Sequence, residues 1–376
     1  MTTEVKQPKQ RSALWRILRW GVHYVAVVVG LVLRLLGAGR SEQCVVRRVT
    51  VGVHRWRGTR RARLAFVSDI HASTRPRCPP ALLASAARTV LAAAPDVVVL
   101  GGDYVDAPAD APLLENTVAP ALLAPLVSTC VPVLAALGNH DQATPALRAH
   151  TVAALTQAGA QVLDHTATVL PHARLRIVGV GDSSTPGDFD PAPLLTRATH
   201  TAPDCLHAPC ECSSTPLALP GAEHAFATLG RPCCCQRDEE DHEEPLITIA
   251  VTHNPDGAEE LVREWRCDVV LAGHTHGTQV WAPPPRGGPV LPWLKRTAPR
   301  WLQPAVRLLH GSDVRRWDWA AGLHRVACPC GANTALLYIT CGLGCHPPGR
   351  IFCPPEVTII DFVPEDDEQM QQQQQL

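Results

Sequence analysis

The segment GHTHG at 273–277 places His274 and His276 one residue apart, between glycines and directly after the apolar run 268–272. Imidazole nitrogens are common ligands of divalent metal ions. In an extended chain, alternate side chains point to the same side, so both rings could face one site. A buried strand gains nothing from two imidazoles. The segment therefore indicates metal chemistry, provided that similar donors follow other strands.

Side chains of metal-binding type also end several other apolar runs. They are Asp69 and His71, Asp103, Asn139 with His140 and Asp141, and His253. Each cluster alone has a plainer explanation, because Asp and Asn form turns and a Ser-Asp pair often starts a helix. The joint order, with a cluster after each of several runs, favours a metal site. Carboxylates, imidazoles and one amide carbonyl suit divalent ions such as manganese, iron or zinc.

The apolar runs themselves predict an α/β fold. The expected strands lie at 44–53, 63–71, 96–103, 131–141, 175–182, 246–255 and 268–277, and two closing strands lie in 336–344 and 357–363. Helical periodicity appears at 80–94 and 144–159. Strands separated by helices indicate a sheet with helices on both sides, and ligands of such sheets bind beyond the carboxyl ends of the strands. Glycines at 101, 102, 138, 273 and 277 should allow sharp turns and close approach there.

The two ends of the chain differ in character from the middle. A basic tail at 1–14 precedes an apolar segment at 15–37, and residues 364–376 form an acidic, glutamine-rich tail expected to be disordered. Between Arg19 and Arg34 the apolar segment has fourteen uncharged residues, short of the roughly 20 that span a bilayer core. Snorkelling of flanking side chains could extend it to a transmembrane helix. A signal-peptide core, an interfacial helix and a buried helix are the alternatives.

We expect membrane association through this segment, with the side of the membrane left open. The formal net charge of −1 gives no reason to expect a nucleic-acid partner, and the sequence identifies no protein partner. Residues 200–245 are rich in Cys, Pro and acidic residues, and we interpret them as an irregular insertion. Its Cys205, His207, Cys210 and Cys212 could bind zinc, although their spacing matches no closed zinc module.

The ordered set of motifs resembles the calcineurin-like metallophosphoesterases, from about residue 60 to 363 apart from the insertion. GGDYVD, GHTHGTQV and the closing YITCGLGC and RIFCPPEVTII resemble a membrane-attached branch of that superfamily. That branch includes bacterial phosphodiesterases and a UDP-2,3-diacylglucosamine pyrophosphatase. The resemblance implies a two-sheet α/β sandwich with helices on the outside, in a domain at 44–363. The insertion, the Pro/Trp-rich stretch 281–319 and cysteines 341, 345 and 353 depart from the pattern.

The resemblance also implies a pair of divalent ions, with manganese expected first and iron or zinc as alternatives. One ion would be held by Asp69, His71, Asp103 and His276, and the other by Asp103, Asn139, His253 and His274. Asp103 would bridge the two ions, because one carboxylate can serve both. His140 would face the substrate and protonate or stabilise the leaving oxygen, with Asp141 orienting its ring.

The function that follows is hydrolysis of a phosphodiester or pyrophosphate bond, with UDP-2,3-diacylglucosamine in lipid A biosynthesis as the leading substrate. An exported phosphodiesterase or phosphatase for soluble substrates is the alternative enzyme. A metal-binding scaffold without catalysis is the alternative from another class. Tryptophans at 281, 293, 301, 317 and 319 could form an apolar lip near the metals, or could be core residues.

Overall fold

The structure, a computed structural model, describes residues 43–53, 56, 61–74, 78–190, 224–229, 246–263, 267–283, 287–300, 302–303, 314–327, 334–346 and 349–365. The apolar segment 15–37, most of the insertion and residues 366–376 lie outside these ranges. Within them, none of the helices combines the length and apolar character that crossing a membrane requires.

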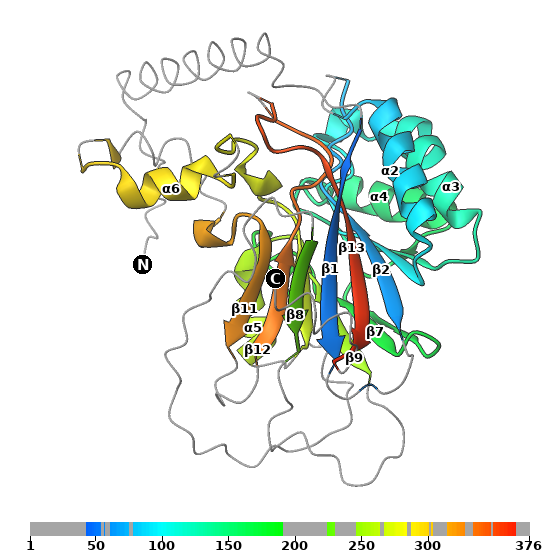
Figure 1. Cartoon of the computed structure of the whole chain (residues 1–376). Coiled ribbons are helices and arrows are strands. Elements are labelled where there is room, and N and C mark those ends of the chain that lie inside the picture. The colour runs from blue at the N-terminus through cyan, green and yellow to red at the C-terminus, as the bar shows by residue number, and fades with distance from the viewer. Residues whose placement is uncertain are drawn as a thin grey trace, which may run out of the picture.

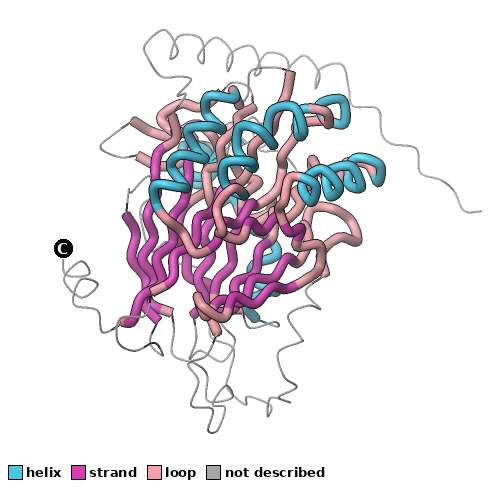
Figure 2. The backbone as a smooth tube through the Cα atoms, turned by 90° about the vertical axis from the view of Figure 1, so that its right-hand side faces the viewer, coloured by secondary structure: helices cyan, strands magenta, loops and turns pink. Residues whose placement is uncertain are grey.

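Two β-sheets face each other, as the resemblance implies. The first has the order β5-β4-β3-β2-β13-β1-β8, built from β1 (Val45–Val53), β2 (Ala62–Val67), β3 (Val97–Leu100), β4 (Val133–Ala135), β5 (Gln161–Val162), β8 (His224–Thr228) and β13 (Glu356–Pro364). The second has the order β11-β12-β10-β9-β7-β6, built from β6 (Ala167–Leu170), β7 (Leu175–Gly179), β9 (Ile247–Val251), β10 (Val269–Ala272), β11 (Gly322–Ala327) and β12 (Thr334–Ile339). Figure 1 labels β1, β2, β8 and β13 of the first sheet and β7, β9, β11 and β12 of the second, and Figure 2 shows the strands from a view turned by 90°.

One buried apolar cluster joins the sheets. Phe66 and Val99 of the first sheet share it with Ile177, Ile249 and Leu271 of the second. Burial of both faces explains why these runs are almost wholly apolar, because a parallel sheet covered on both sides has no solvent face. The two-sheet sandwich is therefore confirmed.

Helices cover the outer faces of the sandwich. On the first sheet lie α2 (Pro80–Ala93), the π-helix η2 (Leu114–Leu123), α3 (Ala124–Val127) and α4 (Pro145–Gln157), grouped on one side of Figure 1. The second sheet carries α5 (Ala258–Arg263), and α6 (Val290–Thr297) projects beyond it. Short 3₁₀ turns occur at η1 (Pro108–Asp110), η5 (Pro255–Gly257), η6 (His276–Thr278) and η7 (Trp317–Trp319).

Local sequence explains the two helices that were expected. The α4 helix begins where the Thr144 side chain accepts a hydrogen bond from the backbone N–H of Leu147 at 3.1 Å, an N-cap followed by Pro145 in the first turn. The α2 helix also starts with proline and ends at Ala94 in the left-handed region. Its buried apolar residues, such as Leu83 and Val90, pack on the first sheet.

One segment of the insertion departs from the sequence-based interpretation. Residues 224–228 form β8, which pairs in parallel with β1 at the edge of the first sheet. Ala225 and Ala227 are buried in the shared core. The short run of small apolar residues is too brief to show a period against its polar surroundings, so only the pairing with β1 reveals it as a strand.

The topology brings the expected ligand positions together. Strands β2, β3 and β4 are parallel neighbours in the first sheet, and β9 and β10 are parallel neighbours in the second. The carboxyl ends of parallel strands lie at one edge of a sheet. The two edges meet, and the loops after these five strands form a single site.

Candidate metal centre

Seven side chains expected to bind metal come together at the strand ends. Asp69 and His71 follow β2, Asp103 follows β3, Asn139 follows β4, His253 follows β9, and His274 and His276 follow β10. Asp69, His71, Asp103 and His253 are almost completely buried. The structure thus collects donors from both sheets into one centre.

One half of the centre is built around His71 and His276. Their Nε2 atoms lie 2.9 Å apart, and the His71 Nε2 lies 3.3 Å from Asp103 Oδ2. The His276 Nε2 lies 3.6 Å from Asp69 Oδ1. These four side chains are the set implied for the first ion.

The other half is built around His253 and His274. The His253 Nε2 lies 3.0 Å from Asp103 Oδ2, and the His274 Nδ1 lies 2.9 Å from the amide oxygen of Asn139. Asp103 therefore faces both halves, as a bridging carboxylate must. These contacts match the set implied for the second ion.

The donor set fits a pair of divalent metal ions. The buried Oδ2 of Asp69 accepts no hydrogen bond within the described part of the chain, although burying a carboxylate oxygen without a partner is costly. Metal ions compensate such groups, and the mixture of imidazole, carboxylate and amide oxygen suits borderline-hard divalent ions. Close groupings of His71, Asp103 and His140 and of Asp103, His253 and His274 point to the same two positions.

The backbone at the ligands is left-handed. Asp69, His71, Asp103, His274 and His276 have φ values of 57°, 48°, 56°, 69° and 50°. The expectation that the paired ligands converge through extended-chain alternation is therefore wrong. The pairs converge because the chain curls at each strand end, a conformation that costs a non-glycine residue about 1 kcal/mol or more and clusters at functional sites.

Two expected glycines allow this close packing. A Cβ atom on Gly138 would lie 2.1 Å from Asp103 Oδ1, and one on Gly273 would lie 2.3 Å from Asp69 Oδ2. Both distances are far inside van der Waals contact. Only glycine lets the two ligand loops approach the carboxylates so closely.

Asp103 and His253 shift each other's pKa in the centre. Burial alone would raise the pKa of Asp103, but His253, followed by His71 and His140, holds this pKa well below its ordinary value. Burial likewise opposes charge on His253, yet Asp103 and Asp69 raise the His253 pKa well above its ordinary value. Desolvation, helped by neighbouring histidines, lowers the pKa values of His274 and His276. Neutral imidazoles are the form that ligates metal.

His140 stands beside the centre and lines its opening. Its backbone N–H donates to Asp103 Oδ1 at 2.9 Å, and its ring Nδ1 lies 2.6 Å from the carbonyl oxygen of Asp106. Because a carbonyl can only accept, Nδ1 carries the proton and donates it. The other ring nitrogen, Nε2, is then the one with a lone pair. The ring is therefore oriented by Asp106 rather than by Asp141.

Asp141 has a different position from the one expected. It is fully buried, and its carboxylate accepts hydrogen bonds from the backbone N–H groups of Asp103 at 2.7 Å, Tyr104 at 2.9 Å and Gly138 at 2.9 Å. It ties the loop after β3 to the loop after β4. Burial, and then the nearby Asp103, raise the pKa of Asp141 to about 7.

His346 belongs to the site and was not among the candidates. Its ring centroid lies 4.4 Å from that of His71 and 4.8 Å from that of His276. Asp106 links it to the centre, because Asp106 Oδ1 lies 3.6 Å from the His346 Nδ1 and 3.5 Å from the His71 Nδ1. The available signal was its place directly after GLGC, in the closing motif that the resemblance singled out.

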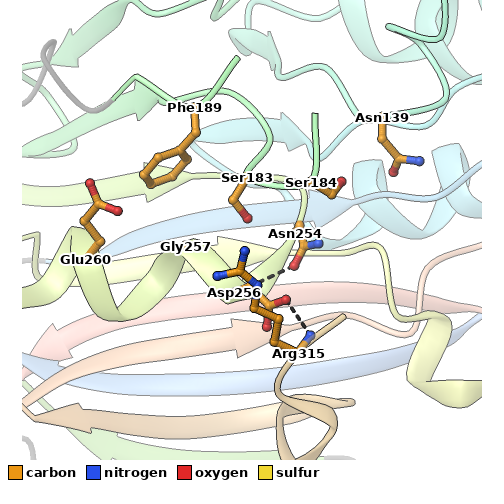
Figure 3. A pocket seen from close by; sticks show the side chains of 9 residues that line it. All are labelled: Asn139, Ser183, Ser184, Phe189, Asn254, Asp256, Gly257, Glu260 and Arg315. Atoms are coloured by element: carbon orange, nitrogen blue, oxygen red, sulfur yellow. Dashed lines mark hydrogen bonds between the residues drawn. The ribbon is translucent and has the colours of Figure 1, made fainter. Parts of the chain in front are cut away.

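The metal centre opens into a small cavity of about 160 Å³, whose walls include Val314 and Trp317. A larger polar cavity of about 610 Å³ lies next to it and shares Asn139 (Figure 3). Of the other tryptophans, Trp281 and Trp319 are buried in the core and Trp293 is 52% exposed, whereas Trp301 lies outside the described residues. Among its described residues, the stretch 281–319 thus supplies Trp317 to the site opening.

Comparison with known proteins defines the class. Residues 62–278, more than half of the chain, match the calcineurin-like phosphoesterase family. This protein belongs to that family, and it is a metal-dependent phosphoester hydrolase.

Individual relatives support the same class. The chain is 25% identical over 306 residues to the phosphodiesterase YaeI of Escherichia coli, covering 80% of this chain and 82% of that protein. It is 27% identical over 309 residues to the UDP-2,3-diacylglucosamine pyrophosphatase LpxG of Chlamydia muridarum, covering 79% and 82%. The LpxG of Chlamydia trachomatis is similar at 27% identity over 305 residues, covering 79% and 82%.

The geometry assigns tasks to the chain in this chemistry. Bound metal ions activate a water and neutralise charge on the phosphoryl oxygens. Asp103 and the loops around it would hold the ligands of bound ions in place, which supplies the positioning on which phosphoryl transfer depends. His140 lines the opening, where we propose that its ring donates a proton to the departing oxygen.

Proposed function

We propose that this protein hydrolyses the pyrophosphate bond of a lipid-linked nucleotide such as UDP-2,3-diacylglucosamine, using two manganese ions at a membrane surface. The observation that carries the proposal is the complete two-part ligand set around Asp103. Similarity to two LpxG pyrophosphatases over about four-fifths of the chain supports the substrate class.

Two exposed apolar side chains support a membrane surface as the place of action. Trp293 of α6 is 52% exposed, and Phe352 is 44% exposed. The segments that carry them are linked through Val280. Val280 forms β-bridges with Ile351 and Phe352, and its carbonyl accepts a hydrogen bond from the N–H of Val290 at the start of α6. Lys295 and Arg296 follow Trp293 on α6, and a basic, tryptophan-bearing helix suits an anionic lipid surface.

The N-terminal sequence adds to this support. The apolar segment 15–37 and its flanking arginines would hold the domain at the bilayer, by insertion or by lying in the interface. The active site would then meet lipid-linked substrates from the membrane side. We propose membrane attachment as the localisation on this ground.

The test is release of UMP from UDP-2,3-diacylglucosamine by the purified full chain loaded with manganese. We expect metal-dependent release, and at least a 100-fold loss in Asn139→Ala, because that substitution removes the amide oxygen proposed to bind the second ion. Metal content measured by mass spectrometry should fall in the same variant. An Arg88→Ala variant, altered on the exposed face of α2, should keep full activity.

Two outcomes would contradict the proposal. Hydrolysis of a simple aryl phosphodiester without any UMP release would favour the second enzyme, a general phosphodiesterase like the relative YaeI. No hydrolysis of either substrate by a protein that still binds two metal ions per chain would favour a scaffold without catalysis.

A further inference from the structure

The polar cavity beside the metal centre has the size of a ligand site and no part in the chemistry described so far. Its volume is about 610 Å³, within the range of 300–1,000 Å³ typical of small-molecule sites. Figure 3 shows its lining, with Phe189 and Ser183 on one side and Arg315 reaching in from the other. It opens to solvent along Glu260 and Arg315, which are both exposed.

The cavity is continuous with the place where the reacting phosphate must sit. Asn139 lines both the polar cavity and the small cavity over the metal centre. The segment 314–317 also contributes to both cavities. Val314 and Trp317 line the small cavity over the metal centre, and Arg315 lines the polar cavity. A substrate whose phosphate contacts the metals can therefore extend one of its halves into the polar cavity.

The residues that line the polar cavity determine which half of the substrate fits in it. Phe189 offers one aromatic ring, while Ser183, Asn254 and Glu260 offer hydrogen-bonding groups and Arg315 offers a cation. The buried Oγ of Ser183 has no hydrogen-bond partner among the described residues. Acyl chains would leave the buried Ser183 hydroxyl without water or a partner, at a cost of about 1–3 kcal/mol. A nucleoside, with an aromatic base, ribose hydroxyls and an attached phosphate, satisfies the lining groups.

Both walls of the cavity are held in place by internal hydrogen bonds. On the Ser183 side, Asp182 accepts from the hydroxyls of Ser184 and Thr185, and Asp188 Oδ2 accepts from the backbone N–H of Asp182 at 2.7 Å. This loop carries Phe189. A binding wall built this way loses little conformational entropy when a ligand enters.

The opposite wall is equally fixed. Asn254 Oδ1 accepts from the Asp256 N–H at 2.9 Å, and the Asp256 carboxylate accepts from the backbone N–H groups of Arg315 at 2.6 Å and Arg316 at 3.0 Å. These bonds hold the Arg315 backbone next to η5 and leave its side chain to line the cavity, as Figure 3 shows.

We propose that this cavity binds the nucleoside half of the substrate, with the base against Phe189 and the phosphate-proximal side near Arg315 and Asn139. The proposal rests on the proposed function and deepens it, since it assigns the nucleotide end to the polar cavity. The acylated end then lies on the side of Trp317, away from this cavity.

The test compares two substrates that share a leaving group. Bis(p-nitrophenyl) phosphate and the p-nitrophenyl ester of UMP both release p-nitrophenolate, and they differ only in the retained half. In the full-length, manganese-loaded protein, we expect Arg315→Gln and Ser183→Ala to lower kcat/KM for the uridine ester about 10-fold each. Their kcat/KM for the bis-aryl ester should stay within about twofold. The matched control Arg88→Gln should change neither value.

Binding gives a second readout. UMP should bind the metal-loaded protein measurably more tightly than inorganic phosphate in calorimetry, and Arg315→Gln should remove that difference. Equal losses for both esters, or unchanged values for both, would overturn the proposal. If the wild-type protein cleaves neither ester, the proposed function fails, and the calorimetric comparison of UMP with phosphate still decides whether the cavity is a nucleoside site.

Discussion

Asp103 is the side chain on which both halves of the metal centre converge. Its Oδ2 faces His71 and His253, and its Oδ1 accepts the backbone N–H of His140. Asp141 in turn accepts the Asp103 backbone N–H. Backbone groups on two loops thus fix Asp103, the carboxylate that we propose bridges the ions, so its position does not depend on bound metal alone.

Asp141 gives the first test of this arrangement. We expect Asp141→Asn to lower the free energy of unfolding of the metal-free protein by about 1–3 kcal/mol. One carboxylate oxygen, which now accepts a hydrogen bond from a backbone N–H, would be replaced by an NH₂ group that cannot accept one. Urea denaturation measures the change. Manganese affinity should fall as well, since the loops that carry Asp103 and Asn139 lose their tie. An unchanged midpoint together with lost activity would instead indicate a direct role for Asp141 in the reaction.

The segment between β12 and β13 is the element that braces Asp69. The N–H of Leu343 donates to the Ser68 carbonyl at 3.0 Å, and the N–H of Gly344 donates to the Asp69 carbonyl at 2.6 Å. The Arg350 Nη2 caps this turn by donating to the carbonyls of Cys341 at 2.6 Å and Gly342 at 2.9 Å. The closing motif therefore acts as a support for the first ligand loop.

Arg350→Lys tests this support. Lysine cannot reproduce a planar fork that reaches several carbonyls, so the turn should loosen. We expect manganese affinity, measured by titration, to fall about 10-fold, in the range found when partners of metal ligands are lost. Arg88→Lys on α2 is the control. Unaltered affinity in Arg350→Lys would show that the turn is held by its backbone bonds to Ser68 and Asp69 alone.

The metal centre as a whole lies across the seam between the two sheets. Asp69, Asp103 and Asn139 come from the first sheet, and His253 and the paired histidines come from the second. Ions bound there join the two layers and should stabilise the folded chain by mass action, about 2.7 kcal/mol per ion at 100 times its Kd.

Metal removal measures this link. We expect EDTA to lower the Tm by several degrees and manganese to restore it, because 1 kcal/mol corresponds to about 2–4 °C in a fold of this size. The variant Asp103→Ala should show no response to manganese. A Tm of the wild-type protein that is insensitive to metal would mean that the ions add nothing to the contact between the sheets.

The sequence predicted that the candidate ligands would meet at one place, because their residue types and their order along the chain are local facts. The pair His274 and His276 stands in one short motif, and the parallel strands that precede each cluster force the clusters to one edge. His346 was missed although it follows GLGC directly, because only the folded turn between β12 and β13 brings its ring beside His71. The left-handed backbone at Asp69 and His71 was not predicted either, and Gly273 and Gly342, which approach the Asp69 side chain closely, lie far from it in the sequence.

The fold was predictable where elements are long and regular, as in α2, α4 and the buried strands. The π-helix η2 was missed because Pro120 stands inside it, and proline ordinarily ends a helix. The wider turn of a π-helix lets the chain continue past the missing N–H. Strand β8 was missed because its five residues are too few to show the period of a strand, and only its pairing with β1 identifies it.

The central position of β13 has a consequence for the order of events during synthesis. The last strand of the chain pairs with both β1 and β2, and the other neighbour of β1 is β8 from the middle of the chain. Strand β1 leaves the ribosome first, yet it has no partner until β8 and β13 have been made. Until those strands are made, the edges of β1 are unpaired, and unpaired strand edges tend to pair with other chains. A nascent chain released before residue 356 would expose the β1 and β2 edges that β13 pairs with, so premature termination should produce aggregation rather than a smaller folded enzyme.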